Sequence, residues 1–154
     1  MSPDPAARLD SGARQQLETV LALLAEERAS VSSVVDERAW QVHVVDSLTG
    51  LEVDGLREAR RIADVGAGAG FPGLVLAVAL PGAEVDLIES VGRKCEFMRR
   101  AIEAAGIANA RVLDTRSEDL AAGEGREAYE AVTARAVGRL STLAELASPL
   151  LKPN

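Results

Sequence analysis

Residues 61–73 read Arg-Ile-Ala-Asp-Val-Gly-Ala-Gly-Ala-Gly-Phe-Pro-Gly, the pattern of a buried strand that runs into a glycine-rich turn. Glycine lacks a Cβ, so the glycines at 66, 68 and 70 can take positive φ values and let the backbone come close to a ligand. Pro72 suits the first position of a helix, where its missing N–H would have no partner. The stretch therefore predicts a strand, a turn open to a ligand, and a helix.

Similar patterns continue along the chain. Strand patterns cover 61–66, 84–89, 110–114 and 130–135, and helix patterns between them cover about 72–80 and 93–105. This alternation predicts an α/β fold, in which a parallel Rossmann-like sheet carries helices on both faces. Ligands of such sheets bind at the carboxyl ends of the strands. Glu89, the last residue of the second strand pattern, is therefore expected beside the glycine turn.

Helix patterns also precede and follow the sheet. Asp10 or Ser11 can cap a helix whose apolar residues share one face: Leu17, Val20, Leu21 and Leu24. A second helix is expected over 36–48, with Trp40, Val44 and Leu48 four residues apart and Gly50 past its end. We expect a helical segment, 1–55, packed on a core formed by 56–154.

The end of the chain carries a helical stripe over 140–151, followed by a turn that would ordinarily lead into another strand. We therefore expect the core to lack the last strands of its sheet. The fourth strand would then form an apolar edge.

The glycine turn alone leaves two kinds of ligand open, because residues 68–73 also fit the dinucleotide pattern G-x-G-x-x-G. A dinucleotide would place its anionic pyrophosphate at the helix N-terminus, where Asp64 would repel it. S-adenosylmethionine instead brings a sulfonium and an ammonium, which gain from a nearby carboxylate. Asp64, together with a strand-end acid suited to ribose hydroxyls, favours S-adenosylmethionine as the cofactor. A dinucleotide and a purely structural turn remain alternatives.

The amino-acid composition limits the kinds of function that the chain can have. The 154 residues carry a net charge of -7 and only 3% aromatic residues, so neither a basic nor an aromatic surface for nucleic acid stands out. The single cysteine excludes an intrachain disulfide and fits a reducing cytosol. An export signal and an apolar run of about 18 residues are both absent, which predicts a cytoplasmic protein without membrane contact. We expect no metal site.

Several stretches of the chain match motifs of a known family and occur in the same order as in that family. They are 43–47 (His-Val-Val-Asp-Ser), 64–73, 87–94, 116–120 and 134–136. Together, over residues 10–154, they resemble the bacterial small-subunit ribosomal RNA guanine-N7 methyltransferases, once named glucose-inhibited division protein B. Val42 stands where that family usually has Arg, and Ala69 where it often has Pro.

The resemblance implies S-adenosylmethionine-dependent methylation of guanine N7 in 16S ribosomal RNA, with naked RNA or the small ribosomal subunit as partner. We expect a monomer. Guanine N7 carries a free lone pair, so the transfer needs in-line placement rather than a strong base. The sequence also lacks the Asp/Asn-Pro-Pro-aromatic motif used for exocyclic amines. A cofactor-binding domain without catalysis and a methyltransferase for another substrate remain alternatives.

The turn and the resemblance together give the expected cofactor-binding residues: Asp64, Gly66, Ala67, Gly68, Gly70, Phe71, Glu89, Ser90, Ser117, Glu118 and Arg135. Several of them have other interpretations. Asp64 could be a buried acid that hydrogen-bonds the turn. Glu89 could be a solvated strand-end acid. Ser117, with its neighbour, could simply cap a helix.

Arg135 and His43 are the expected catalytic residues. Arg135 ends the fourth strand pattern, where a guanidinium could hold a phosphate or the target base. It could equally pair with an acid of the crevice. His43 is the only histidine, and a single histidine on a helix is also often a packed, hydrogen-bonded residue.

Overall fold

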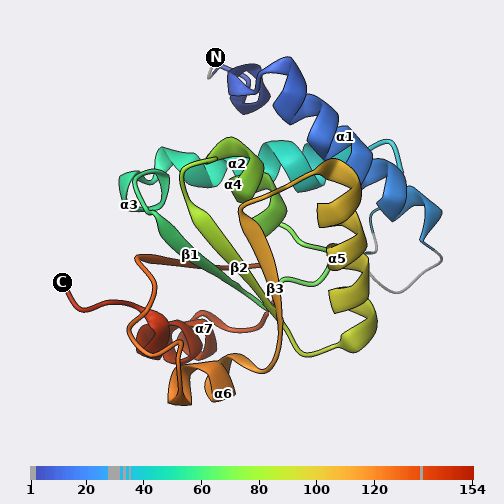
Figure 1. Ribbon diagram of the computed structural model, residues 1–154. Coiled ribbons are helices and arrows are strands. Elements are labelled where there is room, and N and C mark those ends of the chain that lie inside the picture. Colours follow the sequence, from blue (N-terminus) through green and yellow to red (C-terminus); the bar gives the residue numbers. More distant parts are fainter. Residues whose placement is uncertain (1–2, 28–31, 33, 35, 136) are drawn as a thin grey trace.

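A four-stranded parallel sheet forms the centre of the computed structural model, which describes residues 3–27, 32, 34, 36–135 and 137–154 (Figure 1). The strand order is β3-β2-β1-β4. The strands are β1 (Arg61–Val65), β2 (Glu84–Glu89), β3 (Ala110–Asp114) and β4 (Ala131–Ala134). Each lies within the range that its pattern predicts, so the predicted parallel sheet is confirmed.

Helices cover both faces of the sheet (Figure 1). One face carries α1 (Ser11–Glu26), α4 (Gly73–Ala79) and α5 (Gly92–Ala105), and the other carries α6 (Ser117–Ala122) and α7 (Leu140–Ala147). Successive strand side chains point to opposite faces. Ile62 and Leu87 accordingly join the apolar cluster under α4 and α5, whereas Val65 and Ile88 join the cluster on the other face. The strands are thus buried on both sides.

Short sequence signals set the ends of the helices. The Asp10 carboxylate accepts a hydrogen bond from the backbone N–H of Ala13 at 2.7 Å and caps α1, which follows a 3-10 turn at Pro5–Arg8. The predicted apolar face of α1 is confirmed, with Leu17, Val20 and Leu24 fully buried.

The helix expected over 36–48 is wrong in its detail. The helical run begins near Trp40 and changes pitch along its length: a π-helical turn at Trp40–Val45, α2 (Asp46–Thr49) and a 3-10 turn at Gly50–Glu52, with α3 (Asp54–Arg57) after them. Gly50 does not stop the run, because its φ of -57° is right-handed. Val44 and Leu48 are nevertheless buried, as the apolar spacing predicts.

The helical pattern at 140–151 also forms two elements instead of one helix. α7 ends at Ala147 and a 3-10 turn, Ser148–Leu150, follows it. Pro149 explains the change, because proline lacks the N–H that a longer α-helix would need and clashes with the preceding turn. The chain then returns to the sheet, where Leu151 forms a parallel bridge with Tyr129. Among the residues that the structure describes, this is the only β-bridge on the outer side of β4 and of the residues leading into it.

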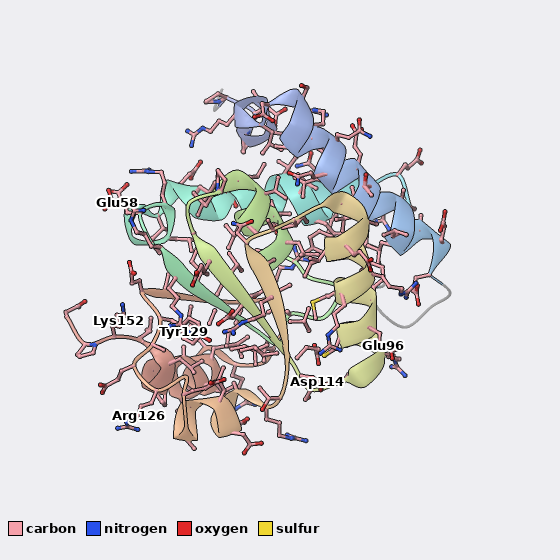
Figure 2. The ribbon with its side chains drawn as sticks, in the orientation of Figure 1. Glu58, Glu96, Asp114, Arg126, Tyr129 and Lys152 are labelled. Carbon is pink, nitrogen blue, oxygen red and sulfur yellow. The ribbon has the colours of Figure 1, made fainter. Side chains whose placement is uncertain are left out.

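A buried polar network lies near the amino ends of the strands. The Asp86 carboxylate, 4% exposed, accepts hydrogen bonds from Nε and Nη2 of Arg111, both at 3.0 Å, and from the Tyr129 hydroxyl at 2.7 Å. Burial, together with the hydrogen bond to Asp86, raises the pKa of Tyr129 above its usual range. The Arg61 guanidinium covers the Tyr129 ring at 5.2 Å. Figure 2 shows Tyr129 near Lys152, whose N–H donates to the Tyr129 carbonyl.

Candidate functional site

The glycine turn lies between β1 and α4, at the carboxyl end of the sheet. Gly66, Gly68 and Gly70 take φ values of 65°, 59° and 101°, a region that residues with side chains rarely adopt. A Cβ on Gly68 would meet only the Gly66 carbonyl oxygen, at 3.9 Å. A Cβ on Gly73 would lie 2.7 Å from a carboxylate oxygen of Asp64. The turn is therefore open at Gly68 and tightly packed where α4 begins.

Glu89 lies beside this turn at the end of β2 and is 7% exposed. Its Oε1 accepts a hydrogen bond from the Gly68 N–H, and its Oε2 accepts from the N–H groups of Ser90 and Val91, all at 2.9 Å. A carboxylate has about four acceptor positions, so Oε1 can take one more donor. The expected closeness of Glu89 to the turn is confirmed, and the solvated alternative does not fit its burial.

Asp64 is fully buried behind the turn. Its Oδ2 accepts from the Gly73 N–H at 2.8 Å, and its Oδ1 accepts from the Thr133 hydroxyl at 3.0 Å. Burial raises the pKa of Asp64 to about 7, although these two hydrogen bonds and the Arg135 charge act in the opposite direction. This geometry fits the structural role considered for Asp64. Its contact with a cofactor stays a prediction.

A crevice of about 150 Å³ opens beside Glu89. Five residues expected from the sequence line it: Gly66, Glu89, Ser90, Ser117 and Glu118. Ser117 is the first residue of α6, next to the end of β3. The structure thus brings together residues from the ends of the first three strands. Ala67, Gly68 and Gly70 belong to the turn beside the crevice.

Two apolar residues that sequence reasoning missed also line the crevice. They are Val137, which follows β4, and Leu146 of α7. A Cβ on Gly66 would lie 2.8 Å from Val137 Cγ2, so Val137 covers the glycine directly. Their distance along the chain from the turn gives no local signal of this contact. Ala136, the last residue of one stretch in the family resemblance, lies outside the described residues.

A second group of expected residues gathers where the N-terminal segment meets the turn. The His43 ring stacks on Phe71, with ring centroids 4.5 Å apart and 15° between the planes. Arg135 donates from Nη1 to the Val42 carbonyl at 3.1 Å and from Nη2 to His43 Nδ1 at 3.0 Å. Its Nη1 also lies 3.8 Å from a carboxylate oxygen of Asp46. The acid that lies within 4 Å of Arg135 is thus Asp46 of α2, which does not line the crevice beside Glu89.

Arg135 also borders a groove of about 330 Å³ beside β4. Polar groups from α2 and β4 face this groove, among them Asp46, Ser47, Thr49 and Thr133. Its volume falls within the range of about 300–1,000 Å³ that is usual for small-molecule sites. The crevice beside Glu89 is smaller than that range. Arg135 lines the groove and Val137 lines the crevice, so the residues after β4 contribute to both hollows.

Among the described residues, no group of three or more His, Cys, Asp or Glu side chains has a geometry suited to a metal ion. In the same part of the chain, no helix is both long and apolar enough to cross a membrane.

Known proteins with similar sequences point to one family. The family model described as rRNA small subunit methyltransferase G matches residues 14–154. The ribosomal RNA small subunit methyltransferase G of Rubrobacter xylanophilus is 43% identical over 145 residues, which cover 90% of this chain and 56% of the relative. That of Sorangium cellulosum is 40% identical over 134 residues, covering 86% and 56%. The chain spans little more than half the length of these curated relatives.

Several solved structures have a similar backbone arrangement. Cofactor-bound Rv0187 from MTB has a TM-score of 0.52 and 23% identity, covering 81% of this chain and 53% of that one. A mutant of MtNAS in complex with S-adenosylmethionine has a TM-score of 0.54 and 19% identity, covering 83% and 48%. At such identities the likeness concerns the fold alone, and it confirms the Rossmann-like α/β fold.

The family model leaves out only the first 13 residues, and two relatives match most of the chain at 40% identity or more. The chain therefore belongs to the rRNA small subunit methyltransferase G family.

Proposed function

We propose that this chain forms the S-adenosylmethionine-binding core of an enzyme that methylates guanine N7 in 16S ribosomal RNA. The observation that carries the proposal is the buried Glu89 carboxylate, which meets an open glycine turn and keeps one acceptor position free. Family membership supplies the substrate class. Naked ribosomal RNA or the small ribosomal subunit is the proposed partner, with a monomer acting on it.

The crevice residues fit the parts of the cofactor. Glu89 would accept a hydrogen bond from a ribose hydroxyl, and the open backbone at Gly68 would allow close approach. Ser117 and Glu118 border the crevice on the side where the adenine would lie. When bound, S-adenosylmethionine supplies a methyl group already activated on a sulfonium.

The protein's own residues would then orient the nucleophile. Guanine N7 needs no base, so the chain's task is to hold the target nucleotide in line with the donor. The groove beside β4 is large enough for a base, and Arg135 at its border offers guanidinium N–H groups to a phosphate or a purine oxygen.

Calorimetric titration with S-adenosylmethionine, and separately with NAD, tests the cofactor part of the proposal. Glu89→Gln should weaken S-adenosylmethionine binding by about 1–3 kcal/mol, because a charged acceptor is lost. Glu84→Gln, at the exposed opposite end of β2, is the matched control and should bind as the wild type does. Binding of NAD alone, or equal binding by both variants, would contradict the proposed site.

Methyl transfer needs a separate assay with labelled S-adenosylmethionine and either naked 16S RNA or small ribosomal subunits. The proposal predicts label in N7-methylguanine. A chain that binds the cofactor but transfers nothing, beside an active family member as positive control, would favour a cofactor-binding domain without catalysis.

A further inference from the structure

Both ring nitrogens of His43 are engaged, and their partners fix the position of the hydrogen. Nε2 lies 2.8 Å from the Val34 carbonyl oxygen and 3.2 Å from the Ser32 hydroxyl, and Nδ1 lies 3.0 Å from Arg135 Nη2. A carbonyl oxygen only accepts and a guanidinium only donates. Nε2 must therefore carry the hydrogen and Nδ1 the lone pair. These contacts select one neutral tautomer of the ring.

The selected tautomer restrains Arg135. The guanidinium donates to the Val42 carbonyl and to His43 Nδ1, and both of these residues belong to the π-helical turn. The Arg135 side chain keeps 32% of its surface exposed and borders the groove beside β4. A guanidinium has five N–H donors, and the hydrogen bonds to Val42 and His43 use two of them.

We propose that His43 is a positioning residue: its neutral ring accepts from Arg135 and aims the guanidinium at a nucleotide in the groove beside β4. The Phe71 stack and the Val34 carbonyl hold the ring, so the N-terminal segment sets the position of a group at the end of β4. The groove's ligand and its use in methyl transfer rest on the proposed function. The contact between His43 and Arg135 is independent of the proposed function.

Protonation of His43 would break this arrangement. A charged imidazole has N–H groups on both nitrogens and cannot accept from Arg135, and two cations would then meet at about 3 Å. Burial lowers the pKa of His43, and the Arg135 charge lowers it further, while the Val34 hydrogen bond acts in the opposite direction. The other charged groups near this contact are the largely exposed Asp46 carboxylate and the buried Asp64 carboxyl group, on which the Arg135 charge also acts. Arg135 should therefore be positioned at neutral pH and released in acid.

Nuclear magnetic resonance tests the contact directly, because the ring signals of a single histidine need no assignment. Two-bond ¹H–¹⁵N spectra should show the neutral Nε2–H tautomer at pH 7 and a His43 pKa below its ordinary value. Arg135→Met should raise that pKa, whereas Arg139→Met, an exposed arginine at the start of α7, should leave it unchanged. The Nδ1–H tautomer, or equal pKa values in both variants, would overturn the proposal.

Two further variants separate positioning from packing. His43→Asn keeps an acceptor near the place of Nδ1, whereas His43→Gln keeps a polar group near Nε2, and both lose the stack on Phe71. We expect His43→Gln to raise KM for the RNA about tenfold, as Arg135→Met does, since a charged hydrogen bond is lost. His43→Asn should retain most of the wild-type value.

Equal losses in both His43 variants would show a purely structural role and overturn the proposal. Absence of methyl transfer by the wild type would instead count against the proposed function, and the magnetic resonance measurement would still decide whether His43 holds Arg135.

Discussion

Replacing Asp64 by Asn should change how the stability of the protein depends on pH. The asparagine can keep both hydrogen bonds of the carboxylate, since its oxygen can accept from the Gly73 N–H and its amide can donate to the Thr133 hydroxyl. The variant therefore removes an ionisable group from a fully buried position without removing its partners. The difference between the two proteins reports the ionisation of Asp64 alone.

The magnitude follows from the pKa of Asp64, which burial raises from 3.8 to about 7. The folded state then holds the proton more tightly than the unfolded state does. This stabilisation is complete below pH 3.8 and is lost as the pH rises to about 7 and beyond. The difference between the two pKa values corresponds to roughly 4 kcal/mol. The unfolding free energy of Asp64→Asn, relative to the wild type, should thus increase by this order between pH 4 and pH 8.

Urea denaturation followed by circular dichroism, at constant ionic strength and several pH values, measures the effect. Asp119→Asn, which changes an exposed carboxyl group in the first turn of α6, is the matched control. Its curve should follow the wild type. Parallel curves for the wild type and Asp64→Asn between pH 5 and pH 8 would refute the assigned pKa and the argument from burial.

Three other changes test the crevice, the Asp86 network and the cap of α1. Val137→Ala removes the side chain that covers Gly66 and should tighten S-adenosylmethionine binding severalfold in calorimetry, because the crevice of about 150 Å³ is enlarged; unchanged or weaker binding would contradict this. Tyr129→Phe removes a hydrogen bond to the buried Asp86 and should lower the unfolding free energy by about 1–3 kcal/mol in urea, whereas no loss would show that Arg111 alone satisfies the carboxylate. Asp10→Ala should lower it by about 1 kcal/mol through loss of the α1 cap, and Asp10→Ser, which restores a capping oxygen, should recover most of that.

Sequence reasoning predicted the elements whose signals are local. The glycine turn, the strand ranges and the cap at Asp10 each depend on residues within one or two turns of chain. The closeness of Glu89 to the turn also followed, because the carboxyl ends of parallel strands meet at one edge.

Contacts between distant segments could not be predicted in the same way. Arg135 and His43 are 92 residues apart, and no periodic pattern connects them. The Asp86 network depends on strand register, which pairs Asp86 with Arg111 across β2 and β3. A charge within a strand buried on both faces does signal a need for a partner, although it does not name the partner. The structure differs from the helix predicted over 36–48 because an apolar residue at every fourth position does not distinguish an α-helix from a π-helix.

The hydrogen bonds of Glu89 bear on the thermodynamics of ligand entry. The carboxylate already binds the Gly68 N–H, so the turn is ordered by the protein itself before any ligand arrives. A ligand that enters such a preorganised pocket loses little affinity to the conformational entropy of the loop. The backbone at 66–70 should accordingly keep the same hydrogen-exchange protection with and without S-adenosylmethionine, and the binding rate should depend on access past Val137 rather than on folding of the turn.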